Sequence, residues 1–222
     1  MRIFPVLIIY SLLTLSTLFA EASIGADVVS RYVWRGTDYG NAAAVQPFIE
    51  TNLGPITVGA WGSWSISPGL YFNGTQEENG DDIMVGEASG NECDLYASTT
   101  VGPVGLTLTD YFFPAYGGTD SLLNLDKHTI ELSGAADLGP VSILAAAYVS
   151  GDYDGDGNSR NSIYLELKHG AFSLGLGNGA YSIDGEFAPV SLAVSAERDN
   201  FSVSYIINPN KETSFLVFGV NF

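Results

Sequence analysis

Charged side chains recur at alternate positions inside apolar runs of this sequence. Glu166 and Lys168, for example, alternate with Leu165 and Leu167. Successive side chains of a strand point to opposite faces, so such charges share one face. A charge held against lipid costs about 2–4 kcal/mol for Lys or Arg, so these residues are expected to point into the lumen of a membrane barrel. The predicted lumen-facing set is Asp27, Arg31, Arg35, Glu50, Glu92, Asp94, Glu131, Glu166, Lys168 and Glu197.

Two uses of this lumen-facing set stay open at the level of the sequence. The charges could form a constriction that sorts solutes, with Arg31 and Arg35 opposite the carboxylates. They could equally be paired charges that brace a narrow interior. Because seven carboxylates face three cations in the set, we expect a modest preference for cations at low ionic strength.

A second candidate site copies the first half of a calcium-binding EF-hand loop. Its alternating carboxylates, Asp152, Asp154 and Asp156, precede a glycine, Gly157, and calcium prefers such oxygen ligands. The twelfth position is Ile163, where a bidentate Glu is expected. The pattern predicts a weak calcium site at most, since Asp-Gly repeats also form ordinary turns. We expect no other cofactor.

Catalysis by a barrel hydrolase would need a histidine as general base. The sequence has two, His128 and His169. His128 follows Asp126 in an Asp-x-His pair similar to that of the omptin proteases, and Asp81-Asp82 could supply a second acidic pair. His169 lies at a predicted turn. Adjacent aspartates on a loop match that site poorly, so we do not expect an enzyme.

Turns of two lengths organise the elements that would position these residues. Three Gly-Pro pairs, Gly54-Pro55, Gly102-Pro103 and Gly139-Pro140, stand between alternating apolar runs, as tight hairpin turns do. Pairs at 169–170 and 199–200 act in the same way. Long polar stretches separate these hairpins at 35–41, 67–91, 114–126, 151–160, 182–187 and 208–212. Transmembrane barrels alternate short periplasmic turns with long outer loops in this manner.

The runs between the turns predict an all-β chain folded as a transmembrane antiparallel up-and-down β-barrel of about twelve strands. Most runs have the length that a tilted strand needs to cross a bilayer. An even number of strands places both chain ends on the periplasmic side, and Phe222 provides the terminal aromatic residue common in outer-membrane barrels. The predicted strands are 24–34, 43–53, 56–66, 92–101, 104–113, 127–138, 141–150, 161–168, 171–181, 189–198, 201–207 and 213–222.

The beginning of the sequence predicts export. Arg2 precedes an apolar run over 3–19, and Ala20-Glu21-Ala22 matches the small-x-small pattern of signal peptidase sites. We therefore expect a cleaved signal peptide, residues 1–22, and a barrel, residues 23–222, located in the bacterial outer membrane. The net charge of −17 argues against nucleic acid as a partner. The single cysteine, Cys93, excludes an internal disulfide.

Several motifs carry a resemblance to a known family. Residues 30–36 (SRYVWRG), 44–47 (AVQP) and 59–63 (GAWGS) are similar to the opening hairpins of the TorF-like porins, also described as Gcw-type conserved proteins. Residues 92–96 (ECDLY) and 111–114 (YFFP) resemble that family's E-x-D-x-Y and Y-x-x-P strands. The resemblance is close over residues 27–114. It implies a small outer-membrane barrel of unassigned substrate.

The expected function is that of a small porin-like barrel through which small solutes or ions diffuse passively. Its expected partners are outer-membrane lipid, these solutes and the barrel-insertion machinery. The alternative is a plugged structural or adhesive barrel that binds a partner through acidic outer loops. In that alternative, the long stretch 67–91, with Glu77, Glu78, Asp81, Asp82 and Glu87, could fold inward as the plug or stand outward.

Overall fold

The computed structural model describes residues 22–40, 42–66, 69–76, 82–87, 91–114 and 123–222, the third and fourth of these ranges by their backbone alone. The predicted signal peptide lies outside the described residues except for its last residue, Ala22. In the described parts of the chain, no helix is long and apolar enough to cross a membrane.

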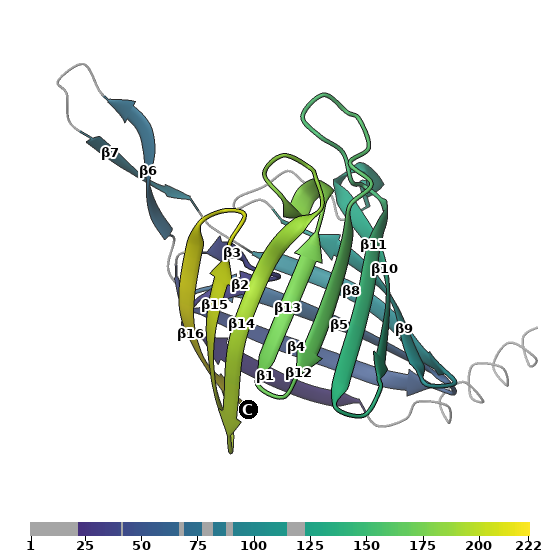
Figure 1. The fold of residues 1–222 in the computed structure, drawn as a ribbon. Coiled ribbons are helices and arrows are strands. Elements are labelled where there is room, and N and C mark those ends of the chain that lie inside the picture. Colours follow the sequence, from purple (N-terminus) through teal and green to yellow (C-terminus); the bar gives the residue numbers. More distant parts are fainter. Residues whose placement is uncertain (1–21, 41, 67–68, 77–81, 88–90, 115–122) are drawn as a thin grey trace, which may run out of the picture.

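Twelve strands close into one antiparallel barrel (Figure 1). Neighbouring strands pair in chain order, and β1 pairs with β16 to complete the ring. The predicted fold class is therefore confirmed. The barrel strands are β1 (Ser23–Val29), β4 (Ala44–Leu53), β5 (Ile56–Ser65), β8 (Glu92–Val101), β9 (Val104–Phe112), β10 (His128–Asp137), β11 (Val141–Ser150), β12 (Ile163–His169), β13 (Phe172–Gly177), β14 (Ala188–Arg198), β15 (Phe201–Asn208) and β16 (Thr213–Asn221).

Connections of different length gather at the two rims of the barrel. The tight turns join β4 to β5, β8 to β9, β10 to β11, β12 to β13 and β14 to β15. Gly54 and Gly102 have φ of 65° and 61° in such turns, a conformation that glycine adopts without strain. The first residues of β1 and the C-terminal Phe222 lie at this same rim. The strand ends that the long connections join lie at the opposite rim, as the sequence predicts.

The outward face of the barrel is apolar and the inward face is polar. On β12, Ile163, Leu165 and Leu167 are exposed, while Tyr164 is buried and Glu166 is half-buried. On β16, Leu216, Phe218 and Phe222 are likewise exposed. Buried positions inside the ring include Gln46, Ser63, Glu92, Asp94, Glu131, Ser191 and Asn208. This inverted pattern suits a protein whose outside meets lipid and whose inside meets water.

Two small sheets are separate from the sheet of twelve strands. β2 (Tyr32–Trp34) pairs with β3 (Thr37–Gly40), and β6 (Gly69–Gln76) pairs with β7 (Asp82–Glu87). The second hairpin falls within the stretch 67–91. The side chains of Glu77, Glu78, Asp81, Asp82 and Glu87, which could form the acidic plug, are not among those that the structure describes. Two short 3₁₀ turns, η1 (Leu125–Lys127) and η2 (Gly179–Tyr181), complete the elements.

The predictions fail at three places on the wall. The first strand ends at Val29 and not at residue 34, because residues 32–40 form the separate β2–β3 hairpin. The strand predicted over 171–181 ends at Gly177, where the chain turns into η2. Strict alternation along residues 189–198 predicts that Val190 shares the apolar face with Leu192. A β-bulge opposite Gly175–Leu176 interrupts the alternation there, and Val190 is fully buried against Tyr164 and Tyr181.

Candidate functional site

The β2–β3 hairpin is the central feature of the candidate site. Trp34 pairs with Thr37, so the turn contains two residues, Arg35 and Gly36. Their φ values are 50° and 78°. Two positive φ values define the type I′ turn that matches the twist of a tight hairpin. A Cβ atom on Gly36 would lie 2.0 Å from the carbonyl oxygen of Val190, so this position requires glycine on two grounds.

The hairpin lies inside the barrel, because it contacts strands on widely separated parts of the ring. The Tyr32 ring lies 5.6 Å from that of Trp61 on β5, and the Trp34 ring lies 5.5 Å from that of Tyr111 on β9. On another part of the wall, Nδ2 of Asn208 on β15 donates to the Gly36 carbonyl over 3.1 Å. A hairpin that touches these strands at once must narrow the lumen.

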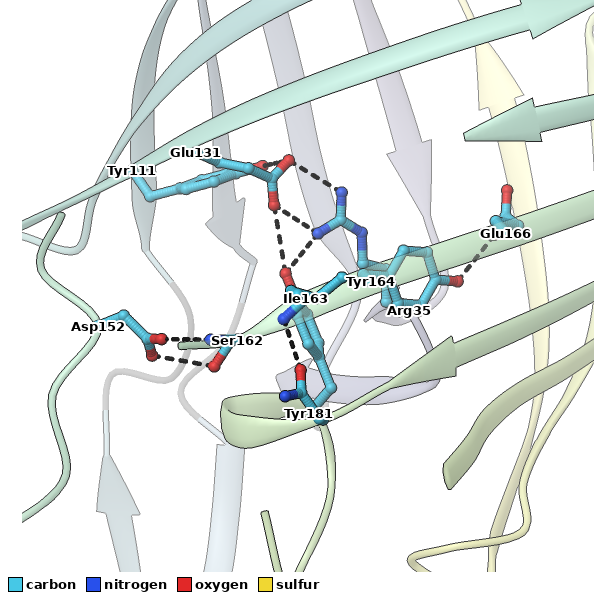
Figure 2. Close-up of polar contacts among 10 residues, drawn as sticks. Arg35, Tyr111, Glu131, Asp152, Ser162, Ile163, Tyr164, Glu166 and Tyr181 are labelled. Atoms are coloured by element: carbon cyan, nitrogen blue, oxygen red, sulfur yellow. Dashed lines mark hydrogen bonds and ion pairs between the residues drawn. The ribbon is translucent and has the colours of Figure 1, made fainter. Parts of the chain in front are cut away.

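An ion pair holds the tip of the hairpin to the wall (Figure 2). The guanidinium of Arg35 donates to both carboxylate oxygens of Glu131 on β10, over 2.5 and 2.9 Å. Tyr181 and Tyr111 also donate to Glu131, over 3.2 and 3.3 Å. Both partners are buried, since only 9% of the Arg35 side chain and 2% of the Glu131 side chain are exposed. Bidentate pairing fixes the orientation as well as the position of the guanidinium.

Aromatic rings surround the Arg35 guanidinium on its remaining sides. Its central carbon lies 4.1 Å from the Trp34 ring centroid, 4.4 Å from that of Tyr164 and 5.4 Å from that of Tyr181. Tyr148 stacks in turn on Tyr181 at 5.5 Å. Cation–π contacts of this kind strengthen when water is excluded. The hairpin tip is thus held by charge, hydrogen bonds and ring packing together.

The base of the hairpin is also anchored. Arg31 forms an ion pair with Asp38 on β3 at 3.4 Å, and its guanidinium lies over the Phe215 ring at 5.5 Å. Next to the turn, Nζ of Lys211 donates to the Thr37 hydroxyl over 3.0 Å. Partial burial lowers the pKa of this lysine, which lies in the turn before β16. The two arginines predicted to line the pore wall therefore belong to the hairpin inside the barrel.

The other predicted lumen residues lie on the strands of the wall, on its inward face. Glu92 and Asp94 are buried near the hairpin, and Tyr32 forms a hydrogen bond with Glu92. Glu50 accepts a hydrogen bond from Tyr96 over 2.8 Å. Glu166 accepts one from Tyr164 over 2.9 Å and pairs with Lys168 at 3.0 Å. Asp27 pairs with Gln46, whose side chain is buried inside the ring, so the Asp27 side chain also points inward.

The half of the lumen nearest the tight turns is more open. A cavity of about 560 Å³ lies there, and its lining includes Lys168, Glu197 and serines of β13, β14 and β15. Glu197 is exposed. The barrel interior thus combines a polar vestibule at one end with the docked hairpin near the rim of the long loops.

The proposed calcium loop is organised by its own hydrogen bonds. Asp152 accepts two hydrogen bonds from Ser162, over 2.7 and 3.0 Å (Figure 2). Asp154 accepts bonds from the backbone and side chain of Asn158, which lower the pKa of its carboxyl. Asp156 donates its backbone N–H to Asp154 as well. Among the described residues, no group of three or more His, Cys, Asp or Glu side chains is placed to hold a metal ion.

The hydrolase alternative depended on His128. Its Nδ1 lies 2.8 Å from Oδ1 of Asp110 on the adjacent strand, and its ring stacks on Phe112 at 4.8 Å. Their pairing register places these side chains on the outward face, away from the lumen. Asp81 and the side chain of Asp82 lie outside the described residues. His169 Nδ1 lies 3.0 Å from the Pro140 carbonyl oxygen at the opposite rim.

Sequence reasoning missed several residues that build the site. Trp34, Tyr111, Tyr148 and Tyr181 form its aromatic shell, and Asn208 holds the hairpin backbone. One signal in the sequence was available. A glycine directly follows Arg35, as in a two-residue turn, and aromatic residues precede it.

A family model described as "Bacterial protein of unknown function (Gcw_chp)" matches residues 17–200 of the chain. The similarity therefore extends well beyond the residues 27–114 on which the resemblance rested. No curated protein matches the chain.

Proposed function

We propose that this chain, which belongs to the bacterial Gcw_chp family of unknown function, is an outer-membrane channel whose constriction is the β2–β3 hairpin. The channel passes small solutes or ions and excludes larger ones. It combines the passive diffusion expected of a porin-like barrel with a lumen narrowed from within.

The outward face supports the membrane location. Large apolar side chains such as Leu95, Leu108, Leu132 and Leu165 are exposed on it across neighbouring strands. An apolar surface of that extent is unfavourable in water and favourable in a bilayer. Export through a signal peptide and insertion by the barrel machinery, with Phe222 at the end of the closing strand, belong to the same proposal.

The observation that carries the channel proposal is the docked hairpin. It is anchored to the wall by the buried Arg35–Glu131 pair, while the vestibule of about 560 Å³ beyond it is polar and open. A constriction placed in a water-filled barrel sets the size limit for solutes, and its charges set their sign.

Solute uptake into liposomes tests this proposal. Refolded wild-type protein should admit small sugars slowly and tetrasaccharides not at all. Replacing residues 31–40 by a Gly-Ser segment of equal length should raise the small-sugar rate severalfold and admit larger sugars. As a control, a Gly-Ser replacement of residues 183–187, which lie in an exposed loop, should leave both rates unchanged.

A plugged structural or adhesive barrel would behave differently. It would admit no sugar in its wild-type form, and the hairpin replacement would be needed for any uptake. Equal uptake by wild type and the hairpin replacement would contradict the assignment of the constriction.

A further inference from the structure

A second cavity lies between the hairpin and the rim of the long loops. Its volume is about 170 Å³. Two carboxyl groups, those of Glu92 and Asp152, and the exposed Arg160 contribute to its lining. The remaining lining is mainly aromatic and includes Trp34 and Tyr39 of the hairpin with Tyr111, Phe113, Tyr148 and Tyr153 of the wall and its extensions. One water occupies about 30 Å³ in the liquid. The cavity is therefore about as large as the space that six water molecules fill.

Aromatic rings from separate elements enclose this cavity. Trp34 meets Tyr39 edge to face at 6.0 Å, and Tyr39 stacks on Phe113 at 6.2 Å. Tyr111 meets Tyr148 edge to face at 6.2 Å. Rings set at several angles offer π faces to a group held among them, and such an arrangement attracts cations.

Glu92 brings a buried carboxyl group to the same cavity. Only 2% of its surface is exposed, and its Oε2 has no hydrogen-bond partner. The neighbouring Asp94 is 5% exposed, and its Oδ1 also has no partner. None of the ion pairs among the described residues includes either carboxylate. Glu92 has a hydrogen bond from Tyr32. A carboxyl group withdrawn from water to this degree requires a further donor or a positive charge at its free oxygen.

We propose that this aromatic cavity binds a small organic cation of the ammonium class. The positive nitrogen lies toward Glu92, and its alkyl substituents pack against the surrounding rings. A bare metal ion fits less well, because among the described residues no group of three or more His, Cys, Asp or Glu side chains is placed to hold one. A neutral sugar fits less well too, because its hydroxyl groups could donate to Oε2 of Glu92 but carry no positive charge for the π faces of the rings.

The inference goes beyond the channel and does not require the lumen to conduct. Binding to the purified barrel in detergent is measured without any membrane current. A barrel that conducts without binding organic cations would overturn this inference alone, and a barrel that binds them without conducting would overturn the channel alone.

Calorimetric titration with choline tests the site. Its neutral isostere, 3,3-dimethylbutan-1-ol, has the same shape without the charge. We expect choline to bind, and the alcohol to bind at least about tenfold more weakly, because a charge-assisted contact in a buried site is lost. Glucose should give no measurable heat of binding.

Three variants locate the binding site. Glu92→Gln keeps the shape of the side chain and should weaken choline binding at least about tenfold. Phe113→Leu removes one ring, leaves the Arg35–Glu131 pair intact, and should weaken binding severalfold. Glu186→Gln removes a carboxylate from an exposed outer loop and should have no effect.

Circular dichroism confirms that each variant is folded before its titration. Equal affinity for choline and the neutral alcohol would overturn the proposal, as would unchanged binding in folded Glu92→Gln. If Glu92→Gln does not fold, the proposal is tested by Phe113→Leu and by the comparison of choline with 3,3-dimethylbutan-1-ol. Unchanged choline binding in folded Phe113→Leu would then overturn it.

Discussion

Substituting Arg35 by Gln should release the hairpin from the barrel wall. Glu131 receives four hydrogen bonds, two from Arg35 and one each from Tyr111 and Tyr181. The substitution removes the two charged donors and leaves a carboxylate that is only 2% exposed without its counter-ion. Breaking one side of such a buried pair costs about 3–5 kcal/mol.

That cost applies mainly to the docked state, because an undocked hairpin leaves Glu131 open to water. The undocked population should therefore rise by roughly two to four powers of ten, at 1.36 kcal/mol for each factor of ten. The backbone amides of β2 and β3 should lose hydrogen-exchange protection by a similar factor. The amides of β12 and β15 should keep theirs.

A double substitution separates charge from packing. Arg35→Met combined with Glu131→Leu removes both charges and keeps apolar volume, so most of the protection should return. Unchanged exchange of the hairpin amides in Arg35→Gln would refute the view that the ion pair holds the hairpin. Equal loss of protection throughout the barrel would show that the pair stabilises the whole fold instead.

Gly36→Ala should lower the free energy of unfolding in urea by more than about 2 kcal/mol, because the new Cβ would clash with the Val190 carbonyl and alanine is strained at positive φ. Gly54 has a similar φ but open space around it, so Gly54→Ala should cost only about 1 kcal/mol. Equal costs for the two variants would refute the close approach at Gly36. In a Cys93→Ser background, Leu165→Cys and Leu192→Cys should resist aqueous thiol reagents, because lipid covers these positions. Asn158→Cys, in an outer loop, should react from outside intact cells. Reaction at Leu165→Cys would contradict a lipid-facing position. Asn79→Cys, in a stretch outside the described residues, should also react from outside. Calcium should bind the 152–160 loop with a Kd no tighter than about 10⁻⁴ M, and micromolar affinity that disappears in Asp154→Asn would contradict this. Hydrogen bonds to the Asp154 carboxylate lower the pKa of this group. The loop should therefore be ordered at pH values above the ordinary aspartate pKa and lose that order as the pH falls through the lowered pKa. Backbone NMR shifts of residues 154–158 report this change, and shifts that stay constant on acidification would refute the prediction. The zero-current potential under a KCl gradient should show cation preference. Arg35 is neutralised by Glu131, whereas Asp27, Glu50 and Glu197 form no ion pair within the part of the chain that the structure describes. Anion preference would contradict the charge argument.

The barrel itself could be predicted from local sequence patterns. Apolar residues such as Ile163, Leu165 and Leu167 alternate strictly with polar ones, so the side-chain period of a strand assigns each residue to a face. The Gly-Pro pairs mark the tight turns because glycine tolerates the positive φ that they need. These signals act within a few residues, and every one of the twelve predicted strands is present.

The inward hairpin could not be predicted in the same way. Tyr32, Val33 and Trp34 continue the apolar character of β1, so residues 24–34 resemble one strand. What folds them inward is a set of contacts with residues far along the chain, including Glu131, Val190 and Asn208. No local pattern encodes partners at such separations. The Val190 bulge escaped prediction for a related reason, because it depends on register with β13.

Single-channel conductance across a planar bilayer tests the central claim most directly. Wild-type protein and the variant with residues 31–40 replaced by Gly-Ser are compared in the same lipid and salt. If the hairpin is the constriction, the wild type gives small current steps and the variant gives steps severalfold larger. Indistinguishable steps from the two proteins would contradict the account.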